Sequence, residues 1–179
     1  GVTFASCLLV ILIAHEFGHF VAAKINRVEQ SLPFFLPAPT LIGTLGAMIV
    51  MRVPPRTRGA LLWVGAAGPW FGFFPAIGFS AWGLAHSPGA TWAAADPARP
   101  LELGTSLAFS FLRSMFAPDS PGLMLHPVAF AGWVGLLLLA INLIPAGQLD
   151  GGHIAYALLG RAQRRLTIAV ATLLMGLGI

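Results

Sequence analysis

The residues His15-Glu16-Phe17-Gly18-His19 have the types and the spacing of a hydrolytic metal centre. In a helix, side chains four residues apart lie on one face, one turn apart, so His15 and His19 can bind one zinc ion together. Glu16 lies beside them, and its carboxylate can take a proton from water held by the ion. The alternative is that the two histidines only hydrogen-bond to neighbouring helices. We favour the metal centre and expect one Zn²⁺ per chain.

This motif lies in an apolar segment, Val2 to Ala23, that is long enough to cross a bilayer. The 179-residue chain is 57% hydrophobic and 9% charged, with a mean hydropathy of +0.83, whereas soluble domains carry about 25% charged residues. An ionisable side chain at the bilayer centre costs ~2.5–3.5 kcal/mol, and a bound zinc ion returns ~10–16 kcal/mol. The composition therefore predicts an integral membrane protein whose few ionisable residues within the bilayer are functional.

We expect an all-α polytopic membrane protein with a core of three to four transmembrane helices, forming a single domain over residues 1–179. Because the chain ends within an apolar run, we expect it to be part of a longer protein. Pro33 and Pro37 interrupt the connection after the first helix, and residues 41–51 favour a strand pair, so this connection is predicted to be a re-entrant hairpin. Pro145 breaks the third span. The expected segments are a first span at 1–25, a re-entrant hairpin at 32–53, a second span at 60–85, a loop at 86–122, a broken third span at 123–160 and the start of a further span at 166–179.

Basic residues are concentrated after the first and third spans, whereas the long loop 86–122 also contains acidic residues. By the positive-inside rule the basic connections are cytoplasmic, and the arginine- and alanine-rich composition suggests a bacterial inner membrane. His19 lies five residues before Lys24, and Asp150 lies eleven before Arg161. At ~1.5 Å per residue both then lie in the cytoplasmic half of the bilayer, where they can meet. Nucleic-acid binding is not expected, because the basic residues flank membrane segments and form no stripe with aromatic residues.

A catalytic zinc ion needs a third protein ligand and one position left for water. Among the remaining candidates, only Asp150 and His153 lie at the predicted depth of the two histidines. His86 and His126 fall at span ends on the opposite side. Asp150 follows the break at Pro145, where the backbone can turn its carboxylate inward. Asp150 is therefore the predicted third ligand, and His153 is expected to be a supporting hydrogen-bond donor.

A second motif, Asn142-Leu-Ile-Pro145-Ala-Gly-Gln-Leu149-Asp150-Gly151, lies in the third span. It matches the Asn-x-x-Pro-x-x-x-Leu-Asp-Gly pattern of a known family. Together with the His15–His19 motif, it makes the chain similar to the site-2 protease family, the intramembrane zinc metalloproteases of the peptidase M50 type. The resemblance covers essentially the whole sequence.

Three further segments are similar to the branch of this family that contains the chloroplast EGY-type proteases. They are the proline-rich stretch 31–39, His126-Pro127 and Gly132-Trp133. Some relatives carry a PDZ domain between the second and third spans. The loop 86–122 is too short to hold one.

The resemblance implies an endopeptidase that cleaves transmembrane protein substrates within the lipid bilayer, as in regulated intramembrane proteolysis. It implies that His15, His19 and Asp150 bind the zinc ion. Glu16 would act as the general base. Asn142 would hold the substrate carbonyl or the oxyanion that develops from it.

Gly68-Pro69 in the second span matches a Gly-Pro motif that packs near the zinc-binding helix in this family, and Pro145 belongs to the second motif. Many members have asparagine three positions after the first of these prolines, where this chain has Gly72. The departure removes one polar contact but leaves the zinc ligands in place. The alternative for Gly68, Pro69 and Gly72 is a close-packed, kinked helix with no further role.

A peptide bond inside a helix is shielded, so a transmembrane substrate must unwind before it is hydrolysed. An extended peptide could add to the edge of the predicted hairpin by main-chain hydrogen bonds, and Gly43 and Thr44 lie in that stretch. A packing loop without substrate contact is the alternative for this segment.

Two other functions use similar residues. A zinc transporter would need a ladder of ligands along its spans, whereas the ionisable groups here cluster at one depth. A catalytically inactive relative would have lost Glu16 or a ligand, whereas this chain keeps all four residues. We therefore expect an intramembrane zinc endopeptidase, and the sequence indicates no oligomeric state.

Overall fold

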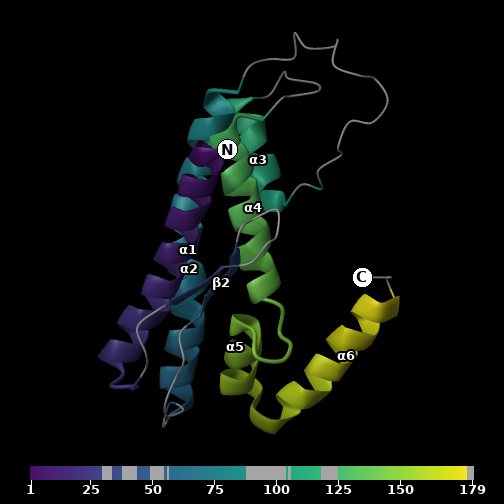
Figure 1. Ribbon diagram of the computed structural model, residues 1–179. Coiled ribbons are helices and arrows are strands. Elements are labelled where there is room, and N and C mark those ends of the chain that lie inside the picture. The colour runs from purple at the N-terminus through teal and green to yellow at the C-terminus, as the bar shows by residue number, and fades with distance from the viewer. Residues whose placement is uncertain are drawn as a thin grey trace. The chain divides into compact units, whose positions relative to one another are not determined.

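A computed structural model describes residues 1–29, 34–37, 44–48, 55, 57–87, 104, 106–117 and 125–176. The described chain is mostly helical and contains one two-stranded sheet (Figure 1). In chain order, the elements are α1 (Val2–Ile25), β1 (Phe34–Pro37), β2 (Thr44–Met48), α2 (Arg58–Ala85), α3 (Leu107–Phe116), α4 (Pro127–Asn142), α5 (Asp150–Leu159), the 3₁₀ turn η1 (Gly160–Ala162) and α6 (Gln163–Gly176).

Two of the described helices are long and apolar enough to cross a membrane, α1 with 24 residues and α2 with 28. At ~1.5 Å per residue, each exceeds the ~30 Å thickness of the hydrocarbon core. Both expose large apolar side chains, including Ile13 and Phe17 of α1 and Trp70 and Phe74 of α2. Such exposure is expected of helices that contact lipid rather than water. The predicted mostly helical chain, with apolar helices long enough to span a membrane, is confirmed at this level.

The segment 123–160, predicted as a third span broken at Pro145, contains two helices, α4 and α5. The apolar helix α4 has only 16 residues and ends at Asn142. The chain then turns over residues 143–149 before α5 begins. Proline has no N–H to donate and disfavours helix in the preceding residue, so Pro145 accounts for this early end.

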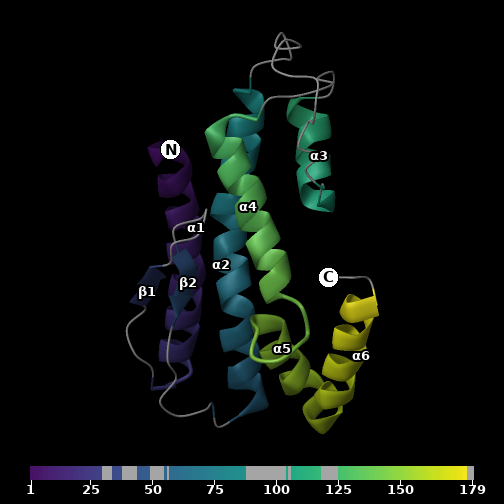
Figure 2. The same ribbon diagram turned by 45° about the vertical axis from the view of Figure 1, so that its right-hand side comes forward.

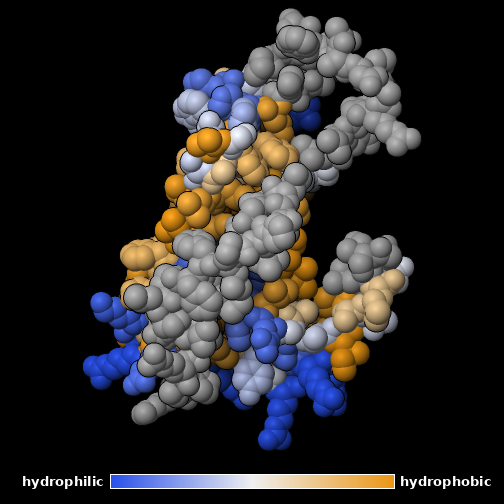
Figure 3. Space-filling model, viewed as in Figure 1, coloured by the Kyte–Doolittle hydropathy of each residue, from blue (hydrophilic) through white to orange (hydrophobic). Residues whose placement is uncertain are grey.

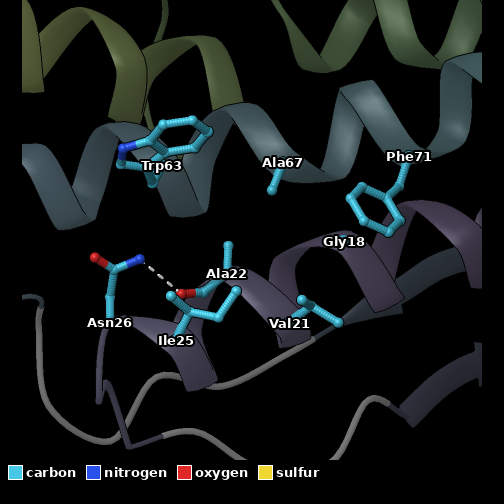
Figure 4. A pocket seen from close by; sticks show the side chains of 8 residues that line it. All are labelled: Gly18, Val21, Ala22, Ile25, Asn26, Trp63, Ala67 and Phe71. Carbon is cyan, nitrogen blue, oxygen red and sulfur yellow. Dashed lines mark hydrogen bonds between the residues drawn. The ribbon is translucent and has the colours of Figure 1, made fainter.

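A hydrogen-bonded capping motif ends α1. Arg27 adopts a positive φ of 55°, and the N–H of Val28 donates to the Ala23 carbonyl at 2.9 Å. This is the Schellman pattern that satisfies carbonyls at a helix end. The side-chain amide of Asn26 adds a bond to the Ala22 carbonyl at 2.8 Å (Figure 4). The helix that carries the first apolar segment therefore ends at Ile25.

The strands β1 and β2 pair antiparallel, with Phe34 opposite Met48 and Phe35 opposite Ala47. The register shifts between Phe35 and Pro37, where proline cannot donate to the ladder. Strands thus form within the predicted segment 32–53, but the first lies before the stretch 41–51 in which we expected both. The two adjacent phenylalanines, which favour strands, outweigh the prolines around them.

The chain folds as two compact units, to both of which α1, α2 and α4 contribute residues. They comprise residues 1–11 with 74–137, and residues 12–73 with 138–179. In the first unit, small residues let helices approach closely. A Cβ added to Gly83 of α2 would collide with the backbone of Ala129 in α4, and one added to Gly132 would collide with Ser80. Such close backbone approach is typical of helices packed in membranes.

The second unit contains the hairpin, α5 and α6, and its buried core joins α1 to α2 through Ala23 and Val64. Figure 2 shows α5 beside the first turns of α2. There the guanidinium of Arg58 lies next to Gly160, which ends α5 with a positive φ of 58°. Exposed basic residues, Lys24 among them, lie at the ends of these elements, and Figure 3 shows hydrophilic surface there.

Candidate metal centre

His15 and His19 lie one turn apart in α1, with their Nε2 atoms 3.0 Å apart and their rings nearly perpendicular at 81°. His15 is only 4% exposed. The Nδ1–H of His19 donates to the main-chain carbonyl of Val64 in α2 at 2.7 Å. Because a carbonyl can only accept, this bond leaves the Nε2 lone pair of His19 free to face the site.

Asp150, the first residue of α5, brings its carboxylate to both histidines. Its Oδ2 lies 3.1 Å from Nε2 of His15, and its Oδ1 lies 3.3 Å from Nε2 of His19. The turn after α4 makes this possible: Gly147 takes a positive φ of 57°, and a Cβ on Gly151 would collide with the carbonyl of Leu143. The glycine after Asp150 therefore lets α5 start directly against the preceding turn.

The three side chains fit a zinc ion. Ligand atoms bound tetrahedrally at ~2.0–2.1 Å lie ~3.3 Å from one another. The two histidine Nε2 atoms lie 3.0 Å apart, and the Asp150 carboxylate approaches them through different oxygens, Oδ2 at 3.1 Å from His15 and Oδ1 at 3.3 Å from His19. With one ligand atom taken from each residue, all three lie within 4.8 Å of one another. Two imidazole nitrogens and one carboxylate oxygen form a donor set that zinc accepts, with a fourth position left for water. No other group of three such side chains that could hold a metal ion occurs within the described part of the chain.

Glu16 is 9% exposed and lies close enough to both histidines and to Asp150 to interact with them electrostatically. It is not one of the three converging residues. A buried carboxylate beside a metal site, but outside the ligand set, can accept a proton there.

Comparison with known families matches residues 3–179 to Peptidase family M50. The chain belongs to this family. M50 is the family of the site-2 proteases, so the resemblance inferred from the two motifs is confirmed.

Several M50 relatives align with nearly the whole chain. It is 34% identical over 182 residues to "Probable zinc metalloprotease EGY2, chloroplastic" of Oryza sativa subsp. indica, covering 99% of this chain and 32% of that protein. It is 32% identical over 178 residues to "Probable zinc metalloprotease EGY1, chloroplastic" of Arabidopsis thaliana, covering 94% and 31%. The chain thus spans about a third of the length of these relatives. No solved structure matches it at a significant level.

The Gly-Pro pair expected from the M50 resemblance lies in α2, next to the metal site. A Cβ added to Gly68 would collide with the imidazole ring of His19. Pro69 lines an apolar pocket together with Leu143 and Ile154. Leu143 is the first residue of the turn between α4 and α5, and Ile154 lies in the second turn of α5. The pair therefore lies between the helix that carries the histidines and the segment that carries the aspartate.

The other predicted M50 residues lie outside the converging set. Asn142 is the half-buried last residue of α4. The Pro145 carbonyl accepts from the Thr167 hydroxyl of α6 at 3.4 Å. His153 packs beside α2 and is not part of the ligand group. Thr44 is the first residue of β2, and Gly43 lies outside the described residues.

Sequence reasoning missed two residues of α2 that contact the site, Val64 and Gly65. A third, Gly72, was noted only as a departure from the family pattern. The signal was present in the spacing of the glycines at 65, 68 and 72, which places them on one face of a helix. What this face meets depends on tertiary packing, which the spacing alone does not specify.

Proposed function

We propose that this chain is the membrane-embedded core of a zinc endopeptidase that hydrolyses peptide bonds of transmembrane substrate proteins within the bilayer. The observation that carries the proposal is the convergence of His15, His19 and Asp150 beside the buried carboxylate of Glu16. Membership of the M50 family and the names of the zinc metalloprotease relatives support it.

Each residue of the site has a role in this reaction. His15, His19 and Asp150 would hold a zinc ion, which supplies a Lewis acid for the substrate carbonyl and an acidified water. Glu16 would take the proton from that water and pass it to the leaving amine. Asn142 would donate its amide hydrogen to the substrate carbonyl oxygen as negative charge develops there.

We propose three membrane spans, formed by α1, by α2, and by α4 continued through the turn into α5. The ends of these spans near Lys24, Arg58 and Arg161 then lie on the same side of the bilayer. The relatives named above are plant chloroplast proteins, so the bacterial inner membrane expected from the composition has no support. The hairpin would be re-entrant, with its backbone groups satisfied by pairing.

A zinc transporter is not favoured. The described residues contain one group of three metal-binding side chains rather than a series of them along the helices. An inactive relative is not favoured either, because the general base and all three proposed ligands are retained.

The proposed activity is tested by removing the ion. The protein is reconstituted in liposomes with a model single-span protein whose membrane helix contains a Gly-Pro break near one end. We expect cleavage within the helix, its loss after treatment with a chelator, and its return with added Zn²⁺ but not Mg²⁺, because imidazole ligands suit zinc. Cleavage that persists in metal-free protein would rule out the zinc mechanism.

We propose that the substrate, once unwound, pairs with an edge of the hairpin. Thr44→Pro removes one N–H from β2, and one main-chain hydrogen bond contributes ~0.5–1.5 kcal/mol, so cleavage should fall by roughly 2–12-fold while zinc content is unchanged. The matched variant Thr44→Val keeps the N–H and favours strand, so it should cleave normally. Equal rates for the wild type and Thr44→Pro, measured on the same substrate, would contradict strand pairing at this position.

A further inference from the structure

One face of α2 contacts all three residues of the proposed ligand set. The residues on this face are Val64, Gly65, Gly68 and Gly72, which are separated by one, three and four positions. In a helix, the spacing of Gly65, Gly68 and Gly72 places them on one face, and Val64 lies at its edge. Three of the four are glycine and bring no side chain of their own, so neighbouring segments approach the α2 backbone directly.

The middle of this face meets His19. The Val64 carbonyl accepts from Nδ1–H of the imidazole at 2.7 Å. A Cβ added to Gly68 would lie under 3.0 Å from three atoms of the same ring, including Nε2. The ring is therefore held between a hydrogen bond at one edge and the bare backbone of Gly68.

The two ends of the face meet the other two ligands. A Cβ added to Gly72 would lie 3.2 Å from Cβ of His15. One added to Gly65 would lie 3.3 Å from the main-chain oxygen of Asp150. Both are tighter than ordinary van der Waals contacts, but neither is a collision with a ring.

We propose that this face of α2 is the template that positions the three metal ligands, and that Gly68 is its principal positioning residue. The histidines come from α1 and the aspartate from α5, and both helices contact α2 at these residues. Ligand distances in metal sites hold to about ±0.2 Å, whereas an added carbon stands ~1.5 Å from its Cα. A methyl group at position 68 therefore displaces His19 by more than a zinc site tolerates.

Close packing alone does not make this face distinctive. Gly18 of α1 also lies against Ala67 of α2 (Figure 4), but there a Cβ would meet main-chain atoms and Cβ of Phe71 rather than a ligand side chain. Gly83 meets the backbone of Ala129, which is not a proposed ligand. Among the glycines that the structure describes, only Gly68 has a neighbouring atom that an added carbon would displace and that would bind the ion.

The inference rests on the proposed zinc site and is tested with three variants of the full chain, Gly68→Ala, Gly78→Ala and Gly83→Ala. Gly78 is a matched control, because it lies in α2 with nothing within 4 Å of an added Cβ. Gly83→Ala is a control for a helix-packing collision that involves none of the proposed metal ligands. The affinity for Co²⁺, used as a spectroscopic probe in place of zinc, is measured by competition with a chelator, together with its visible spectrum and the unfolding temperature.

We expect Gly68→Ala to lose about 10–100-fold in Co²⁺ affinity, the usual effect of changing residues that orient metal ligands, and to shift the Co²⁺ spectrum. Gly78→Ala should keep affinity and spectrum, and its unfolding temperature should be unchanged or higher, because alanine is the stronger helix former. Gly83→Ala should lower the unfolding temperature but keep affinity and spectrum. Gly65→Ala and Gly72→Ala should lose some Co²⁺ affinity, but less than Gly68→Ala loses.

Wild-type affinity and spectrum in Gly68→Ala would overturn the inference, and so would an equal loss of affinity in Gly83→Ala. If Gly68→Ala does not fold, Gly65→Ala and Gly72→Ala test the inference instead. Unchanged Co²⁺ affinity in these two variants would overturn it. Failure of the wild type to bind Co²⁺ would instead refute the zinc site itself, which separates the two claims.

Discussion

Replacing Glu16 with glutamine is expected to lower the cleavage rate of a transmembrane substrate by about 10²–10⁴-fold, the usual contribution of a general base. This corresponds to ~3–5 kcal/mol of lost transition-state stabilisation. Glutamine has the same shape but cannot take a proton from water. Because Glu16 is not among the three converging residues, the variant should keep its full zinc content. The measurement is the rate of cleavage in liposomes, with bound zinc determined on the same sample.

Glu29→Gln is the matched control, since Glu29 is exposed just beyond the end of α1. It removes the same charge and should cleave at the wild-type rate. Undiminished cleavage by Glu16→Gln would reject the proposed base. Loss of zinc together with loss of cleavage would assign Glu16 to the metal ligands instead.

Asp150→Ala is expected to lose zinc and, with it, all measurable cleavage. A protein zinc site contributes ~10–16 kcal/mol over three or four ligands, so one ligand accounts for about 3–4 kcal/mol, or roughly 10²–10³-fold in affinity. The substitution also removes a carboxylate from the first turn of α5, which costs only ~0.3–1 kcal/mol. Loss of the ion therefore dominates over any loosening of the helix. Zinc affinity is measured by competition with a chelator.

The control for Asp150→Ala is His86→Ala. His86 lies at the end of α2 in the first unit, where its Nδ1–H donates to the carbonyl of Trp82 at 2.8 Å. Removing it takes away a potential metal-binding side chain that is not in the proposed site, so zinc affinity should not change. Retention of wild-type zinc affinity by Asp150→Ala would show that the aspartate is not a ligand.

The metal site was the most predictable part of this protein, because its signals are local. The spacing of His15 and His19 is a property of any helix, and the apolar segment around them predicts that helix. Asp150 was found by its depth relative to the flanking basic residues, a property of membrane insertion that needs no knowledge of packing. The structure brings the three side chains together, and their binding of an ion stays a prediction.

The features that sequence reasoning missed depend on contacts between distant segments. The strand at Phe34 was hidden by the prolines around it, and it forms because a partner 14 positions away in the chain, Met48, lies opposite. Gly65 and Gly72 look like ordinary glycines of a membrane helix until α1 and α5 are packed on α2. The carbonyl of Val64 has no signature in sequence at all, because every residue has one.

The central claim is that one zinc ion is bound by His15, His19 and Asp150. X-ray absorption at the zinc edge, recorded on the purified zinc-loaded protein, tests it most directly. We expect one ion per chain with two imidazole nitrogens and oxygen ligands at ~2.0–2.2 Å. A sulfur ligand at ~2.3 Å, which Cys7 would have to supply, or the absence of paired imidazole scattering would contradict it.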